Sequence, residues 1–252
     1  MKTASSLAKP GSNTILGALG EDAYQYILPS LEPVDVTLGD IICEAGGLLT
    51  HAYFPEGCVL SLLTVMENGA EIECANIGNE GAFGIFPAMY GAASSTRCLV
   101  QLVGPMQRCE ISPLRELFHA DPEIQDLFVS YSDTVLSQVA QTVGCNALHT
   151  IEQRMCRWLL MMHDRAKGNE LTYTHEFLAR VMGANRTSIT HAAQSLQRRG
   201  FITYRRGLMQ IEDRAGMEAA SCECYGVVRA RFEEFLFPPD TAYQPTKGGR
   251  GR

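Results

Sequence analysis

The sequence predicts an α+β protein with an N-terminal antiparallel β-roll, a long helix and a C-terminal winged helix-turn-helix. Three observations support this prediction. Short apolar runs follow one another closely between residues 34 and 111, one helical stripe starts near residue 121, and two short helices followed by a hairpin fit residues 171–211. Strands gathered in one half of a chain and helices in the other are typical of α+β proteins.

The apolar runs of the first half predict a β-roll domain over residues 15–120, after a disordered N-terminus over 1–14. Short runs rich in Val, Ile, Tyr and Phe, separated by Gly, Pro and Asn, are typical of strands. Between two of these runs, Glu67-Asn68-Gly69 predicts a hairpin with a type I′ turn, because Asn and Gly tolerate positive φ angles. Residues 78–96 do not fit a strand, and we expect a loop with a short helical turn there.

A long helix is predicted to begin at Asp121-Pro122, where Asp can cap a helix and Pro fits its first turn. Apolar residues recur along it every three or four positions and form one narrow stripe. They are Ile124, Phe128, Tyr131, Val135 and Val139. This stripe could pack on the roll or pair with the same helix of a second chain. A long helix between two domains favours the pairing, so we expect a dimer interface and a hinge over 121–149.

Residues 150–237 are predicted to form a winged helix-turn-helix domain with a C-terminal helical segment over 213–236, before a flexible basic tail over 238–252. Thr150 and Gln153 fit a capping box at the start of the domain. Further along, Thr174 and Asn185 can cap two short helices, and Gly183 supplies the tight turn between them.

The polar side of the second short helix is the candidate nucleic-acid surface. If Ile189 faces the core, the opposite side bears polar side chains that can bond base edges and phosphates. They are Thr187, His191, Gln194 and Arg198, with Arg186 flanking them at the start of the helix. Ser188 lies in the first turn, where unpaired backbone N–H groups favour an anion, and Arg205 and Arg206 mark the cationic tip of the following hairpin. A protein-binding domain with a solvated polar face is the alternative.

The charge of the chain agrees with a nucleic-acid surface in this segment. Residues 150–216 hold 11 basic and 6 acidic side chains, a net charge of +5, against −12 for the remainder. Such a segment can bind phosphates while the rest of the chain repels them. The sequence has neither an apolar stretch long enough for a membrane span nor one typical of a signal peptide, so we expect a cytoplasmic protein that does not bind membranes.

The nine cysteines are scattered and mostly have apolar neighbours, which is typical of reduced core thiols. Only Cys222 and Cys224 stand close together, and a lone CxC is a weak metal signal, so we expect these two to pack, with no metal site and no cofactor. The sequence contains no phosphate-binding loop and no nucleophile–base pair with an orienting group. We therefore expect no catalytic residues and no enzyme activity.

Residues 34–211 resemble the Crp/Fnr family of the cyclic-AMP receptor protein and the fumarate-nitrate reduction regulator, most specifically in the segment FLARVMGANRTSITHAAQSLQRRGFI. The resemblance implies a transcription regulator that binds an inverted-repeat operator in double-stranded DNA as a homodimer and contacts RNA polymerase. It also implies base reading by Arg186, Thr187 and His191 and a phosphate contact by Ser188. Thr187 stands where the family usually has Glu, and His191 where Arg is common, so the operator sequence cannot be transferred.

The sensor half departs from relatives that bind cyclic nucleotides through a Gly-Glu-Leu segment and an Arg-Ser pair. Here Gly84 precedes Ile85, which cannot accept the ribose hydrogen bond, and Ser95, Thr96 and Arg97 fill the phosphate region in changed order and register. We therefore expect a roll that binds another ligand or none. The alternatives are a cyclic-nucleotide-responsive regulator and a ligand-binding scaffold that does not bind DNA. The N-terminal cysteine cluster of an iron–sulfur centre is missing from this sequence.

Overall fold

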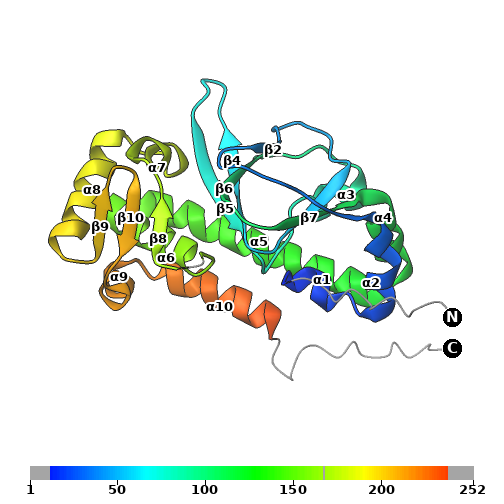
Figure 1. Ribbon diagram of the computed structural model, residues 1–252. Helices are drawn as coiled ribbons and strands as arrows, with labels where there is room; N and C mark the ends of the chain where they lie inside the picture. Colours follow the sequence, from blue (N-terminus) through cyan, green and yellow to red (C-terminus); the bar gives the residue numbers. More distant parts are fainter. Residues whose placement is uncertain (1–11, 167, 238–252) are drawn as a thin grey trace, which may run out of the picture.

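The computed structural model describes residues 12–166 and 168–237. Two modules of sheet and helix lie along one long helix, as Figure 1 shows. Of the predicted unstructured ends, residues 1–11 and the tail over 238–252 lie outside the described part. No helix in the described ranges is long and apolar enough to cross a membrane.

Residues 12–14 correct the prediction of a disordered N-terminus. Asn13 is buried and caps helix α1 (Thr14–Ala18), because its Oδ1 accepts a hydrogen bond from the backbone N–H of Leu16 at 3.1 Å. Its Nδ2 donates to the carbonyl oxygens of Pro55 and Gly81 at 2.7 and 2.8 Å. These bonds attach the start of α1 to the roll.

The predicted antiparallel β-roll is confirmed and consists of two sheets. The first has the strand order β1-β7-β3, formed by Leu31–Pro33, Met106–Glu110 and His51–Pro55. The second has the order β2-β6-β4-β5, formed by Ile41–Cys43, Arg97–Leu102, Val59–Val65 and Glu71–Ile77. Helix α2 (Glu21–Ile27) and a 3₁₀ turn (Leu28–Ser30) precede the first strand, and helix α4 (Ile111–Ala120) follows the last.

The predicted hairpin joins β4 and β5, but its turn type differs from the prediction. Only Gly69 of the turn has a positive φ, of 80°, and its N–H donates to the carbonyl of Met66. This is a type I turn followed by a glycine bulge, a common three-residue hairpin loop. Between β5 and β6 the expected short helical turn is confirmed as α3 (Ile85–Tyr90).

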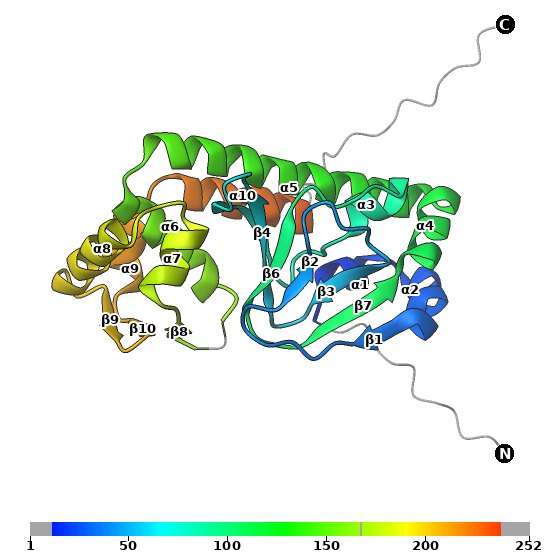
Figure 2. The same ribbon diagram turned by 90° about the horizontal axis from the view of Figure 1, so that it is seen from above.

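Helix α5 (Pro122–Leu148) begins as predicted, since the side chain of Asp121 accepts from the backbone N–H of Glu123 at 2.9 Å. Figure 2 shows it running along both modules. The helix continues without a break to Leu148, through most of the segment predicted to contain the hinge, and His149 is its C-cap. Thr150 and Gln153 then form the predicted capping box of helix α6 (Ile151–His163), so the break between the modules is confined to the junction of α5 and α6.

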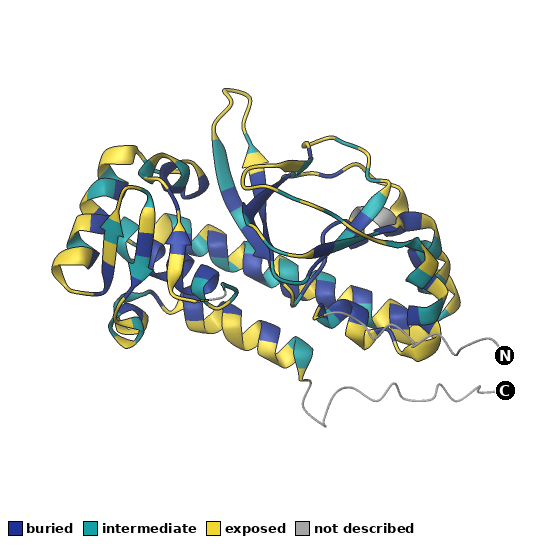
Figure 3. Cartoon of the chain, viewed as in Figure 1, coloured by how far each residue is buried: buried dark blue, intermediate teal, exposed yellow. Residues whose placement is uncertain are grey.

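Three residues of the stripe predicted to form the dimer interface instead pack within their own chain. Ile124, Phe128 and Tyr131 are buried within their own chain, and the Tyr131 hydroxyl donates to the carbonyl of Ala82 at 2.9 Å. Val135 and Val139 are half-buried against the same roll. Figure 3 shows buried residues recurring along α5 where it lies behind the roll. Three exposed apolar side chains of the helix form another stripe with seven-residue spacing, Val129, Leu136 and Val143, and Leu148 is exposed at its end.

The C-terminal module combines a helix-turn-helix with a small sheet. Helices α7 (His175–Val181) and α8 (Arg186–Arg198) are followed by strands β9 (Ile202–Arg205) and β10 (Leu208–Ile211). A short strand that sequence reasoning missed, β8 (Glu170–Thr172), completes a sheet of order β8-β10-β9.

The segment predicted as helical over 213–236 is two helices, α9 (Arg214–Ala220) and α10 (Cys224–Leu236). The break at residues 221–223 turns the chain, so α10 runs back along α5 (Figure 1). Near its end, the Phe235 ring lies 5.8 Å from the Tyr131 ring. The C-terminal helix therefore covers part of α5 instead of extending the helix-turn-helix.

The roll and the C-terminal module contact each other through β5 and the loop that follows it. Trp158 on α6 donates its Nε1–H to a carboxylate oxygen of Glu73 on β5 at 3.1 Å, and both side chains are buried. In the turn between α7 and α8, a Cβ on Gly183 would lie 2.5 Å from the Cδ1 atom of Ile72 on β5, so this turn needs glycine for space as well as for its φ of 57°.

Candidate nucleic-acid interface and roll cavity

Helix α8 is fixed at its start by the predicted cap. The Oδ1 atom of Asn185 accepts from the backbone N–H of Ser188 at 2.7 Å. Ile189, Ala193 and Leu196 are buried, which confirms the predicted inner face. The cap uses only one of the first-turn N–H groups, so the others remain available to an anion at this end of the helix.

The outer face of α8 presents the predicted polar residues to solvent. Arg186, Thr187, His191 and Gln194 are exposed, and Ser188 is half-exposed. In the part of the chain that the structure describes, no hydrogen bond or ion pair occupies these side chains, so they are free to bond base edges. Four exposed arginines of α8 and the hairpin behind it have no acidic partner within the described residues: Arg186, Arg198, Arg205 and Arg206.

The hairpin between β9 and β10 forms the predicted wing. Arg206 and Gly207 both have positive φ angles, 54° and 85°, which is the type I′ geometry. The side chains of Arg205 and Arg206 are therefore held at the tip of a tight, exposed turn.

Two residues that sequence reasoning missed attach the wing to the helices. His175 stacks on Tyr204 of β9 with ring centroids 4.4 Å apart, and its Nδ1 lies 3.0 Å from the Thr190 hydroxyl on α8. Burial, and then the nearby charge of Arg186, lower the pKa of His175. The stacked ring is therefore neutral at pH 7. Beside it, Gln194 and Arg198 of α8 and Tyr204 line a groove of about 520 Å³ between helix and wing.

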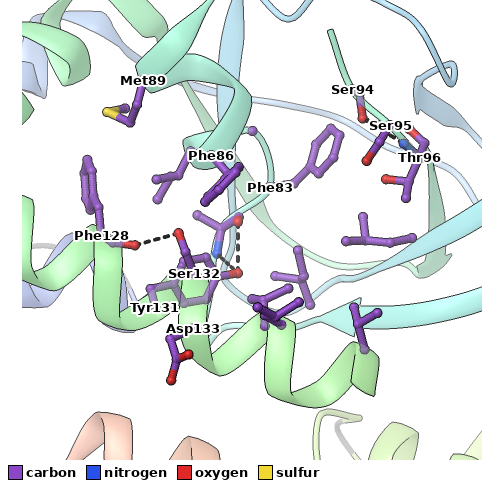
Figure 4. Close-up of a pocket in the computed structure, with 18 of the residues that line it drawn as sticks. Phe83, Phe86, Met89, Ser94, Ser95, Thr96, Phe128, Tyr131, Ser132 and Asp133 are labelled. Atoms are coloured by element: carbon purple, nitrogen blue, oxygen red, sulfur yellow. Dashed lines mark hydrogen bonds between the residues drawn. The ribbon is translucent and has the colours of Figure 1, made fainter. Parts of the chain in front are cut away.

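A second cavity, of about 610 Å³, lies between the roll and α5. Figure 4 shows the rings of Phe83, Phe86 and Phe128 on its walls and the hydroxyl side chains of Ser95 and Thr96 on one side. The predicted ligand residues Gly84 and Ile85 also line it. Its walls are therefore mainly apolar, with a few hydroxyl groups.

Arg97, the cation expected near a ligand phosphate, is not among the residues that line this cavity. Its Nε donates to a carboxylate oxygen of Glu44 at 2.7 Å, and its Nη1 forms an ion pair with the buried Glu71. Among the described lining residues the only charged one is Asp133, whose carboxylate lies 3.1 Å from the guanidinium of Arg231. The cavity thus offers no cation to a phosphate.

Comparisons with known proteins agree with this architecture. The sequence model of the Crp-like helix-turn-helix domain matches residues 153–220. A transcriptional regulator of the Crp/Fnr family from Eubacterium rectale superposes with a TM-score of 0.66 at 18% identity, covering 80% of this chain and 94% of that one. For FixK2 from Bradyrhizobium japonicum the TM-score is 0.66 at 12% identity, with 76% and 98% covered.

A third structure, the CRP/FNR-family regulator TTHA1359 from Thermus thermophilus, gives a TM-score of 0.60 at 20% identity, covering 75% of this chain and 98% of that one. A search of curated proteins by sequence gave no match. At these identities the structural likeness shows the fold, and the matched domain adds the helix-turn-helix. The chain therefore has the fold of Crp/Fnr-family regulators and, over residues 153–220, a Crp-like helix-turn-helix domain.

Proposed function

We propose that the protein binds specific operators in double-stranded DNA as a homodimer and regulates transcription from them. The observation that supports this best is the outer face of α8, which is polar, exposed and without hydrogen-bond or ion-pair partners among the described residues, next to a wing with two arginines. In this proposal α8 lies in the major groove and Arg186, Thr187 and His191 reach base edges. Ser188 and the wing arginines then contact phosphates.

The exposed stripe of α5 supports the dimer. Val129, Leu136 and Val143 are 56%, 64% and 65% exposed, unusual values for large apolar side chains that follow one another on one helix. Their seven-residue spacing is that of a two-stranded coiled coil. A helix of 27 residues is about 40 Å long, enough for several such layers. Two chains paired along this stripe present two α8 helices to one face of the DNA, which calls for an inverted repeat.

The roll cavity in this proposal receives an uncharged, largely apolar ligand or none. Ile85 is buried in the wall and cannot accept a ribose hydrogen bond, and Arg97 is already paired with two carboxylates. Cyclic AMP or cyclic GMP would bring a phosphate into a cavity whose described walls hold no cation. Burying an unpaired phosphate there is strongly unfavourable.

The remaining partners follow from regulation of transcription. We place the protein in the cytoplasm, where it meets DNA and contacts RNA polymerase, without a role for membranes.

The direct test is selection of bound sequences from a pool of random double-stranded DNA. We expect enrichment of an inverted repeat with half-sites about 10–10.5 base pairs apart, centre to centre. His191→Ala should change the enriched bases, whereas Arg229→Ala, which removes an exposed positive charge from α10, should not. A pool that stays random would reject the proposal and favour a ligand-binding scaffold.

A further inference from the structure

Four potential metal ligands meet at the junction of the two modules. Cys145 and His149 lie one turn apart at the end of α5, so they point to the same side of the helix. Cys222 lies in the break between α9 and α10, and Cys224 is the first residue of α10. The ligand atoms of the four residues all lie within 4.8 Å of one another, and the three thiols are buried.

The spacing fits a single tetrahedral ion. Zinc–sulfur bonds of about 2.3 Å and zinc–nitrogen bonds of about 2.0–2.1 Å give tetrahedral edges of about 3.8 Å between two sulfurs and about 3.5 Å between sulfur and nitrogen. In the protein, the Sγ atoms of Cys145 and Cys222 are 3.6 Å apart, and the Sγ of Cys224 lies 3.5 Å from the Nδ1 of His149.

The surroundings orient these ligands as they would in a metal site. The Nε2 atom of His149 lies 3.2 Å from a carboxylate oxygen of Glu223. An imidazole that donates from Nε2 keeps a lone pair on Nδ1, the atom that faces Cys224, and such carboxylate–histidine pairs are common behind metal ligands. The side-chain amide of Gln141 donates to the Sγ of Cys224 at 3.0 Å.

We propose that Cys145, His149, Cys222 and Cys224 bind one Zn²⁺ ion. Three thiolates and one imidazole complete a four-coordinate shell, which is the composition of a structural zinc site and leaves no open position for catalysis. A Cys145–Cys222 disulfide would use two of these groups and give no role to the paired His149 and Glu223. In this proposal Cys222 and Cys224 are metal ligands, whereas the sequence alone predicts only that they pack.

The position of the site gives the ion a structural consequence. Cys145 and His149 lie in the last turn and at the C-cap of α5, immediately before α6, whereas Cys222 and Cys224 lie just before and at the first residue of α10. One ion would therefore clamp the end of the long helix to the C-terminal helices and limit motion between the roll and the DNA-binding module.

The first test measures metal binding by the reduced full-length protein. We expect one Zn²⁺ per chain in competition with a chromophoric chelator, and a visible absorption band typical of tetrahedral cobalt with thiolate ligands when Co²⁺ replaces Zn²⁺. Hydrogen exchange of residues 145–153 should slow when Zn²⁺ is added. Reduced wild-type protein that binds no metal would overturn the proposal, and an unchanged exchange rate would contradict the clamp. Because these measurements use the wild-type chain, they do not depend on how a variant folds.

The second test uses variants. Cys145→Ser and His149→Gln should each abolish stoichiometric binding, whereas Cys43→Ser, a change at a buried thiol of the roll, should leave it intact. Glu223→Gln should keep one ion per chain but weaken its affinity by about 10–100-fold, as expected for a group that supports a ligand. Retention of wild-type affinity in both Cys145→Ser and His149→Gln would show that these residues are not ligands.

Discussion

The ion pair between Glu80 and Arg165 joins the loop after β5 to the end of α6, and its loss should be strongly destabilising. The Nε atom of Arg165 lies 3.1 and 3.2 Å from the two carboxylate oxygens of Glu80, and an Nη atom completes a bidentate contact. The side chains are only 11% and 12% exposed. Burial by itself would raise the pKa of Glu80, but the Arg165 charge and its hydrogen bonds hold it below the ordinary value of 4.5.

Arg165→Met removes the charge and keeps most of the side-chain volume, so it leaves a carboxylate buried without its cation. Removing one partner of a buried pair costs about 3–5 kcal/mol, a large share of the about 5–15 kcal/mol that stabilises a typical protein. Urea unfolding at pH 7, followed by the fluorescence of Trp158, measures this loss; Trp158 is the single tryptophan and lies in the same interface. A Glu80→Gln/Arg165→Met double variant should recover part of the stability that Arg165→Met loses, because no buried charge remains.

Arg165→Met should also change the direction in which the free energy of unfolding depends on pH. In the wild type the unfolded state binds more protons at Glu80 near pH 4.5, so the pair stabilises the fold above that pH and its contribution is lost as the pH falls through the lower folded pKa. Without Arg165, burial dominates and the folded pKa lies above 4.5, so the variant loses stability as the pH rises. This reasoning would be refuted if the unfolding free energies of the wild type and Arg165→Met differed by under about 1 kcal/mol at pH 7. It would also be refuted if their difference did not shrink at acid pH.

Other perturbations test the dimer, the cavity and the module boundary. Leu136→Asp should give a monomer by light scattering, because it places two carboxylates in an apolar interface between the chains. Phe128→Ala should stay dimeric but lose about 3–5 kcal/mol of stability. A monomeric Phe128→Ala variant would show that the buried stripe around Phe128 forms the dimer interface. Cyclic AMP and cyclic GMP should bind weakly or not at all in calorimetry and leave DNA affinity unchanged; micromolar binding that is lost in Arg97→Ala would contradict this. Thr150→Ala should lower the free energy of unfolding by about 1 kcal/mol through loss of the capping box, and an unchanged urea midpoint would show that the cap adds nothing.

Features determined by neighbouring residues could be predicted from the sequence. The caps at Asp121, Thr150, Thr174 and Asn185 all form, because each depends on a side chain two or three residues from the N–H group that it binds. The inner and outer faces of α8 follow from the helical period for the same reason.

Features that depend on which distant surfaces meet could not be predicted. The period of α5 identifies an apolar face around Phe128, but it does not say whether the roll or a second chain covers that face. Likewise Cys145 and Cys222 are 77 positions apart, and only the break after α9 and the return of α10 along α5 bring them together. The three-residue strand β8 is too short to show a pattern of its own.

The central claim is that α8 reads the operator while the wing only holds the backbone, and one binding titration separates the two roles. Arg186→Ala and Arg205→Ala are compared on an operator and its single-base variants at several salt concentrations. Loss of an arginine contact to a guanine edge should remove about 1–3 kcal/mol of discrimination at one base pair in each half-site. Loss of a phosphate contact should weaken all sequences alike and reduce the slope of log affinity against log salt by about 0.9 per contact. We expect the first result for Arg186→Ala and the second for Arg205→Ala. An Arg186→Ala variant that keeps the wild-type rank order of sequences would contradict it.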